Sequence, residues 1–95
     1  MIICAALLVQ FESLKTPTVI HCRRHGDGYE TIRDLCYVSN TRYSSIKEGF
    51  VDHNNNFLDR YDAFCHAKEC GQLSQTTLWH KEDNRESELY SEDLY

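Results

Sequence analysis

The sequence contains one proline, Pro17, and no apolar run long enough to cross a bilayer as a helix. Its most apolar stretch is the opening MIICAALLVQF, about half the length that a membrane-spanning helix needs. No lysine or arginine precedes the apolar residues, although a secretory signal peptide begins with positive charge. These absences predict a protein that does not contact a membrane, and the opening stretch suits a buried strand instead.

Closely spaced cysteine pairs are also absent. The cysteines are odd in number, and no two of them form a Cys-x-x-Cys pair: Cys4, Cys22, Cys36, Cys65 and Cys70. Secreted disulfide frameworks and structural zinc sites depend on such close, regular spacing. We therefore expect free thiols in a cytosolic protein, with no metal and no cofactor.

The sequence also has no overall excess of basic residues. The net charge is -5, and residues 81–95 alone carry six acidic and two basic residues. Residues 1–80 are therefore nearly neutral. This argues against duplex DNA as a partner, because a DNA-binding face must neutralise several phosphates. A single compact anionic ligand is compatible with this balance.

The sequence predicts four strands, two of them near the N-terminus. Residues 2–9 form a continuous apolar run, the stretch ESLKTP interrupts it, and the β-branched residues 18–22 follow. The two runs predict a pair of antiparallel strands. Residues 46–52 and the FL pair after the turn sequence HNNN predict two further, shorter strands.

Helical spacing is present in two segments. The first follows Asp27, a predicted N-cap with Glu30 three residues later, where apolar residues recur at every third or fourth position. The second follows Asp59, another predicted N-cap, and ends at Gly71. Small residues on its apolar face predict close packing against a sheet or another helix.

The order of these elements predicts an α+β fold, with a small antiparallel sheet and two helices. We expect residues 1–80 to form this single domain and residues 81–95 to form an acidic C-terminal segment. Leu94 and Tyr95 are apolar, which is unusual at the end of a solvated acidic run. We therefore expect the last residues to dock on the body or on a neighbouring subunit.

Positive charge is concentrated in the stretch CRRHGDG, residues 22–28. It lies between a predicted strand and the start of a predicted helix, where unpaired backbone N–H groups and the helix dipole favour an anion. Arg23, Arg24 and His25 provide donors that suit a phosphate group. The alternative interpretation is a solvated turn whose arginines pair with the acidic segment, and the sequence does not decide between the two.

The tripeptide Arg24-His25-Gly26 resembles the motif of the histidine phosphatases, in which such a histidine accepts the phosphoryl group. That chemistry also needs a second histidine, a general acid and further arginines. None of the other histidines lies in a supporting motif, and the chain is far shorter than the domain of that family. A small phosphoryl-transfer enzyme using His25 is therefore kept as an alternative.

Four blocks of the sequence resemble, in order, a family of small proteins encoded by tailed phages. They are IICAA, RHGD, GFVDHNNNFLDRYDAFCHAKECGQL and the terminal LYSEDLY. The sequence departs from the family pattern at Asn55 and Asn56, where glycine is usual, and at Tyr61-Asp62. This family is similar to the anti-CBASS sponges, phage proteins that sequester the cyclic-nucleotide signals of bacterial immunity.

The resemblance implies a non-enzymatic protein in the cytoplasm of the infected bacterial host. It also implies a homo-oligomer, with a tetramer favoured, and ligand pockets at or near the subunit interfaces. The expected ligand is a cyclic dinucleotide, which needs a few cations for its phosphates and aromatic faces for its bases. No catalytic residue is predicted. The predicted ligand-binding residues are Arg23, Arg24, His25, Asp27, Tyr29, Tyr43 and Arg60.

A third hypothesis comes from the charge distribution alone. The acidic segment of residues 81–95 suits a modulator that docks on a basic partner protein of the host. Recovery of an intact nucleotide from the protein would favour a sponge, conversion of the nucleotide an enzyme, and absence of binding the modulator.

Overall fold

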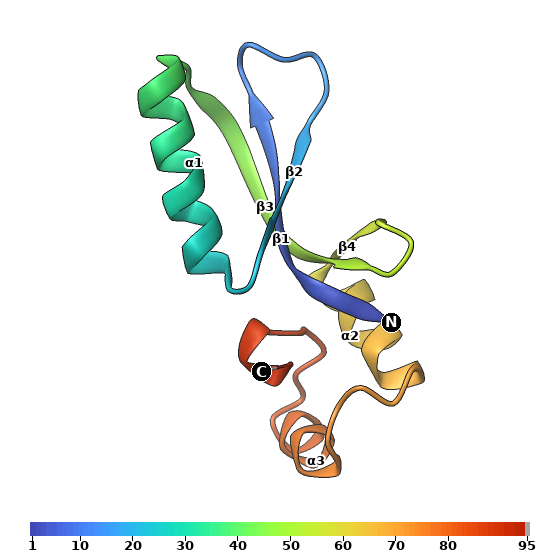
Figure 1. Ribbon diagram of the computed structural model, residues 1–95. Helices are drawn as coiled ribbons and strands as arrows, with labels where there is room; N and C mark the ends of the chain where they lie inside the picture. Colours follow the sequence, from blue (N-terminus) through green and yellow to red (C-terminus); the bar gives the residue numbers. More distant parts are fainter. Residues whose placement is uncertain (95) are drawn as a thin grey trace.

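The computed structural model describes residues 1–94, which form four strands, three α-helices and one short 3₁₀-helix (Figure 1). In chain order these are β1 (Ile2–Phe11), β2 (Thr18–Cys22), α1 (His25–Ser39), β3 (Tyr43–Asp52), β4 (Phe57–Asp59), α2 (Arg60–Glu69), α3 (Gln75–Asp83) and η1 (Ser91–Asp93). The predicted α+β class with a small antiparallel sheet is confirmed. Helix α3 is an addition to the two helices that the sequence predicted.

All strand pairs are antiparallel, and the sheet order is β2-β1-β3-β4. Strand β1 lies between β2 and β3, and most of its residues are buried or half-buried, which agrees with the apolar sequence of residues 2–9. It pairs with β2 from Ala5 opposite Cys22 to Val9 opposite Thr18. The long strand β3 covers its other side, and the short β4 pairs only with the last part of β3.

Helix α1 packs on one face of the sheet (Figure 1). Alternate residues of β1 point toward it, so Leu7 and Val9 are fully buried together with Ile32 of α1. A side chain at Gly28 would place its Cβ 2.7 Å from Leu7 Cδ1, so the close approach of this helix to the sheet requires glycine there.

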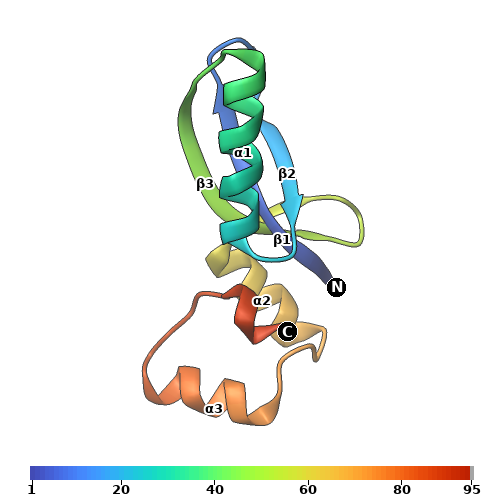
Figure 2. The same ribbon diagram turned by 60° about the vertical axis from the view of Figure 1, so that its left-hand side comes forward.

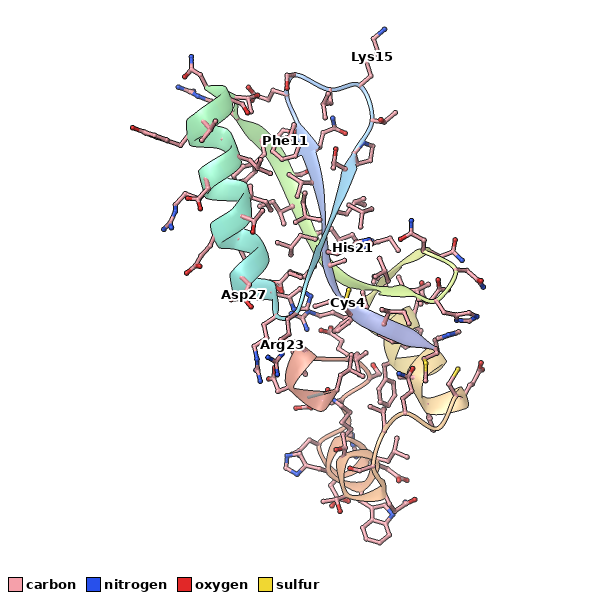
Figure 3. The ribbon with its side chains drawn as sticks, in the orientation of Figure 1. Cys4, Phe11, Lys15, His21, Arg23 and Asp27 are labelled. Carbon is pink, nitrogen blue, oxygen red and sulfur yellow. The ribbon has the colours of Figure 1, made fainter. Side chains whose placement is uncertain are left out.

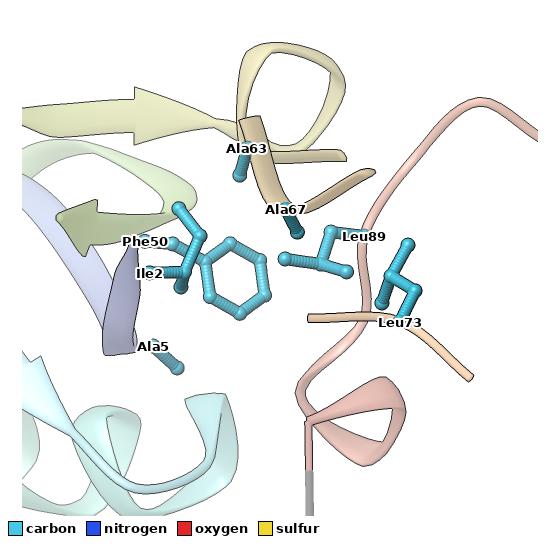
Figure 4. Close-up of a cluster of buried hydrophobic side chains, with 7 residues drawn as sticks. All are labelled: Ile2, Ala5, Phe50, Ala63, Ala67, Leu73 and Leu89. Carbon is cyan, nitrogen blue, oxygen red and sulfur yellow. The ribbon is translucent and has the colours of Figure 1, made fainter. Parts of the chain in front are cut away.

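A second apolar cluster joins the other end of the sheet to α2 and the C-terminal segment (Figure 4). Its members are Ile2, Ala5, Phe50, Ala63, Ala67, Leu73 and Leu89. Ala63 and Ala67 of α2 are fully buried, as the predicted close packing of this helix requires. Leu89 is also fully buried, although it lies in the acidic part of the chain.

The C-terminal segment folds back around Lys81, and it is joined to the body at Leu89, whose backbone N–H donates to the Arg60 carbonyl at 2.9 Å. The expected boundary after residue 80 falls inside α3, whose residue Lys81 has a side chain only 3% exposed. Its Nζ lies 2.8 Å from Asp93 Oδ2 and donates to the Glu88 carbonyl at 2.9 Å. In both views η1 folds back beneath the sheet (Figures 1 and 2). Of the residues expected to dock, Ser91 is buried and Leu94 packs on the second cluster, while Tyr95 lies outside the described residues.

Asp59 caps α2 as predicted, and its side chain accepts a hydrogen bond from the Asp62 backbone N–H at 2.8 Å. We expect Asp59→Ala to lower the free energy of unfolding by about 0.5–2 kcal/mol, because this N–H loses its partner. Urea unfolding of the two proteins measures the difference. Asp34→Ala is the control, since Asp34 is exposed and makes only a surface ion pair with Arg33. Equal losses in both variants would contradict the capping role.

Candidate functional site

The candidate site is built around the turn that joins β2 to α1, labelled in Figure 3 by Arg23 and Asp27. Arg24 is the N-cap of α1, with extended backbone (φ -131°, ψ 150°), and no side chain caps the helix start. The prediction of Asp27 as the N-cap is wrong. The N-cap lies three residues earlier, at Arg24, and the Asp27 N–H already donates to the Arg24 carbonyl at 3.1 Å.

Arg23 and Arg24 are both exposed at this turn. No atom outside the local backbone lies within 4 Å of where a Cβ on Gly26 would be, so the space beside the helix start is open. Asp27 and Tyr29 follow on the exposed part of the first turns of α1. Arg23 lies on the side of the turn that faces the C-terminal segment (Figure 3) and makes an interaction within the chain.

His25 is buried and fixed on both ring nitrogens. Its Nε2 lies 2.8 Å from the Gly49 carbonyl of β3, and because a carbonyl only accepts, this nitrogen carries the hydrogen. Nδ1 is then free to accept from Arg60 Nη2 at 3.4 Å. The edge of the ring contacts Phe50, with the ring centres 5.2 Å apart. This anchoring on β3 explains why the helix starts at His25.

Arg60, the first residue of α2, connects several elements. Its Nη2 forms an ion pair with Glu48 of β3, and its Nη1 donates to the Leu89 carbonyl at 2.8 Å. The Arg60 guanidinium also lies 4.8 Å from the centre of the Tyr90 ring. Arg60 was predicted to contact a ligand, but here its Nη atoms bind groups of the protein itself.

Glu48 links Arg60 to α1. Tyr29 donates its hydroxyl hydrogen to Glu48 Oε1 at 3.0 Å. The hydrogen bond from Arg60 holds the pKa of Glu48 below its ordinary value, against the opposing effect of burial. Burial and the hydrogen bond to Glu48 raise the pKa of Tyr29. These contacts and those of His25 join three predicted residues, Tyr29, His25 and Arg60, into one network.

Tyr43 is placed apart from the arginine turn. It pairs with Phe11 at the opposite end of β3 and is about half exposed.

The sequence did not predict two residues of this region, Glu48 and Lys81. Glu48 could have been found from strand alternation, because it shares a side of the strand with Ile46 and Phe50. Lys81 gives no such signal, since it begins a polar, acidic run.

Metal binding and nucleophilic attack by a cysteine are two other chemistries to which the structure is relevant. Within residues 1–94, no three His, Cys, Asp or Glu side chains are grouped so that they could hold a metal ion. Burial raises the pKa of the Cys22 thiol to about 11, with a smaller effect from Cys4, which disfavours Cys22 as a nucleophile near neutral pH.

A cavity of about 470 Å³ lies between α3 and the C-terminal segment. Glu86, Glu92 and Asp93 line it, and Lys81 is already paired with Asp93. Its negative charge makes it a poor site for a phosphate, so the open surface at the turn suits an anion better than this cavity does. No helix in the described part of the chain combines the length and apolar character needed to span a membrane.

Residues 1–95 match the family described as "Phage T4 y16D protein". No curated protein and no solved structure matches the chain. Since the family match covers the whole sequence, the chain belongs to the phage T4 y16D protein family.

Proposed function

We propose that this phage protein is a non-enzymatic sponge that binds a cyclic dinucleotide in the cytoplasm of the infected bacterial host. By sequestering the signal it would prevent activation of the CBASS immune response. Membership of a phage family and the resemblance of the sequence to the anti-CBASS sponges support this function. The proposed ligand contacts are centred on the arginine turn.

The observation that carries the proposal is the pair of exposed arginines at an uncapped helix start. A helix start leaves backbone N–H groups without partners, and here no side chain accepts from them. Arg24 adds a guanidinium at the N-cap position, and Gly26 leaves room for a ligand to approach the backbone. This arrangement matches one phosphate of a compact ligand rather than the long phosphate track of a duplex.

The contacts of His25 favour binding over phosphoryl transfer. A phosphoryl acceptor needs a ring nitrogen that can approach the phosphorus atom. In His25, one nitrogen faces the Gly49 carbonyl and the other faces Arg60, and only 7% of the residue is exposed. We therefore propose that His25 positions the start of α1 and that Tyr29, which is 40% exposed, offers an aromatic face to a base.

The test is to titrate the protein with 3′,3′-cyclic GMP-AMP by calorimetry, then denature the complex and analyse the nucleotide by chromatography. We expect saturable binding and recovery of the nucleotide intact. Conversion to a linear product would support the phosphoryl-transfer enzyme instead. Absence of binding across a panel of cyclic dinucleotides would contradict the sponge and favour a modulator that binds a host protein.

A further inference from the structure

Strand β2 is an edge strand of the sheet, and no other described strand pairs with its outer side (Figure 1). Its sequence, TVIHC, has no lysine, acidic residue or proline within it. Proteins that keep an edge strand from pairing with other chains usually place charges, proline or a bulge there. Strand β2 has a regular register with β1 and contains none of these protections.

An exposed apolar surface lies along the same side of the molecule. Leu35 and Val38 of α1 are 41% and 82% exposed, and Leu14 in the loop after β1 is 50% exposed. Leu14 and Leu35 line a cavity of about 190 Å³. Leu35 lies seven residues after Gly28, on the side of α1 that faces β1 and β2: a Cβ on Gly28 would lie 2.7 Å from Leu7 Cδ1 and 3.0 Å from the Cys22 sulfur. Tyr29 bonds Glu48 of β3 from one side of this face, and helical spacing turns Val38 to the opposite side, toward β2.

The total surface is large for a chain of this size. A compact monomer of 11.2 kDa is expected to expose about 5,700 Å². This chain exposes 6351 Å² and is elongated, with extents of 45 × 22 × 20 Å. The surplus of about 650 Å² is close to the roughly 800 Å² that each partner contributes to a standard interface.

We propose that the edge of β2, together with Leu14, Leu35 and Val38, is the interface with a second copy of this chain. Two β2 strands would pair antiparallel about a two-fold axis and continue the sheet across the dimer. A second copy fits because an antiparallel edge can pair with itself, so one surface serves both partners. The surplus area per chain is also close to one partner's share. The apolar surface at the Thr18 end of one β2 would then lie beside the Cys22 end of the other.

The test compares two lysine substitutions on the same helix. Val38→Lys puts a charge on the proposed interface, while the control Tyr37→Lys puts the same charge on the other side of α1. Tyr37 is 88% exposed and follows Tyr29 and Arg33 in steps of four residues, and Tyr29 bonds Glu48 of β3. Neither side chain is buried, so both variants should keep the wild-type circular dichroism spectrum.

Sedimentation equilibrium up to about 100 µM protein measures the association. We expect a dimer for the wild type, the same dimer for Tyr37→Lys, and association at least about tenfold weaker for Val38→Lys. Hydrogen exchange should also show amides of residues 18–22 protected in the wild type and less protected in Val38→Lys. A monomeric wild type, or equal association of the two variants, would overturn the proposal. None of these measurements uses a nucleotide, so their outcome is independent of the sponge function.

Discussion

Replacing Arg60 by alanine should lower the free energy of unfolding by about 2–4 kcal/mol, because three buried or half-buried groups lose their donor. Glu48 loses its ion pair, the Leu89 carbonyl loses the bond from Nη1, and His25 Nδ1 loses the contact with Nη2. Removing one member of a fully buried pair costs about 3–5 kcal/mol. The value expected here is lower, because the Arg60 and Glu48 side chains remain 19% and 33% exposed.

Urea unfolding at neutral pH measures this loss, and Arg33→Ala is the matched control. The Arg33 side chain is 75% exposed and has only a 3.8 Å ion pair with its neighbour Asp34, so its removal should cost less than about 0.5 kcal/mol. If the two arginine variants were equally stable, Arg60 would not hold the elements together.

The effect of Arg60→Ala should also depend on pH. Arg60 lowers the pKa of Glu48 in the folded protein, so the ion pair stabilises the fold above the pKa that Glu48 has when unfolded. This contribution is lost as the pH falls through the folded pKa and Glu48 becomes protonated. The difference in stability between the wild type and Arg60→Ala should therefore shrink in acid. A difference that stayed constant would mean that the ion pair with Glu48 contributes little.

Local patterns of the sequence predicted the elements that depend on local interactions. The capping of α2 by Asp59 and the left-handed Gly71 (φ 70°) after that helix both follow from nearby residues. Helix α3 was not predicted, because it has no apolar face at helical spacing, although Ser74 caps its start by accepting from the Thr77 N–H at 3.1 Å. Lys81 donates to the Glu88 carbonyl and pairs with the Asp93 carboxylate, and both groups come next to it only after the C-terminal segment folds back.

At the candidate site, too, local features were predicted and long-range contacts were not. The residue types at the turn predicted a positive cluster beside a helix start, and the exposed Arg24 occupies that position. The sequence could not predict that Arg60 and His25 would be bound to Glu48 and Gly49, because those contacts join three elements. The burial of His25 could not be predicted either, because its hydrogen-bond acceptor is a backbone carbonyl of β3 that is distant in the sequence.

The proposed β2 interface has a consequence for the arginine turn. In an antiparallel pair, the two copies of Cys22 lie toward opposite ends of the paired strands, so the two arginine turns would also lie apart. Each copy would then hold its own ligand contacts at this turn. The sponge resemblance implies pockets at or near interfaces, and under this arrangement any pocket shared between Arg24 and another subunit would need a second, different contact.

Arg24→Ala should weaken the binding of 3′,3′-cyclic GMP-AMP by about 10- to 150-fold, because a charge-assisted hydrogen bond to an anion contributes roughly 1.5–3 kcal/mol. The fold should not change, since the Arg24 side chain makes no capping hydrogen bond and is exposed. Arg23→Ala is the comparison. Neighbouring residues in extended backbone point to opposite sides, so both arginines cannot readily face one phosphate. Arg23 also has an interaction within the chain.

We therefore expect Arg23→Ala to lose less affinity than Arg24→Ala and to change the unfolding temperature more. Calorimetric titration of both variants gives the affinities, and thermal unfolding without nucleotide gives the stabilities. If both variants kept the affinity of the wild type, the arginines would belong to a solvated turn, and the ligand would have to bind elsewhere. If Arg24→Ala lost binding together with stability, the loss could not be assigned to a phosphate contact. A loss of affinity in Arg24→Ala at unchanged stability is the result that places the phosphate at the start of α1.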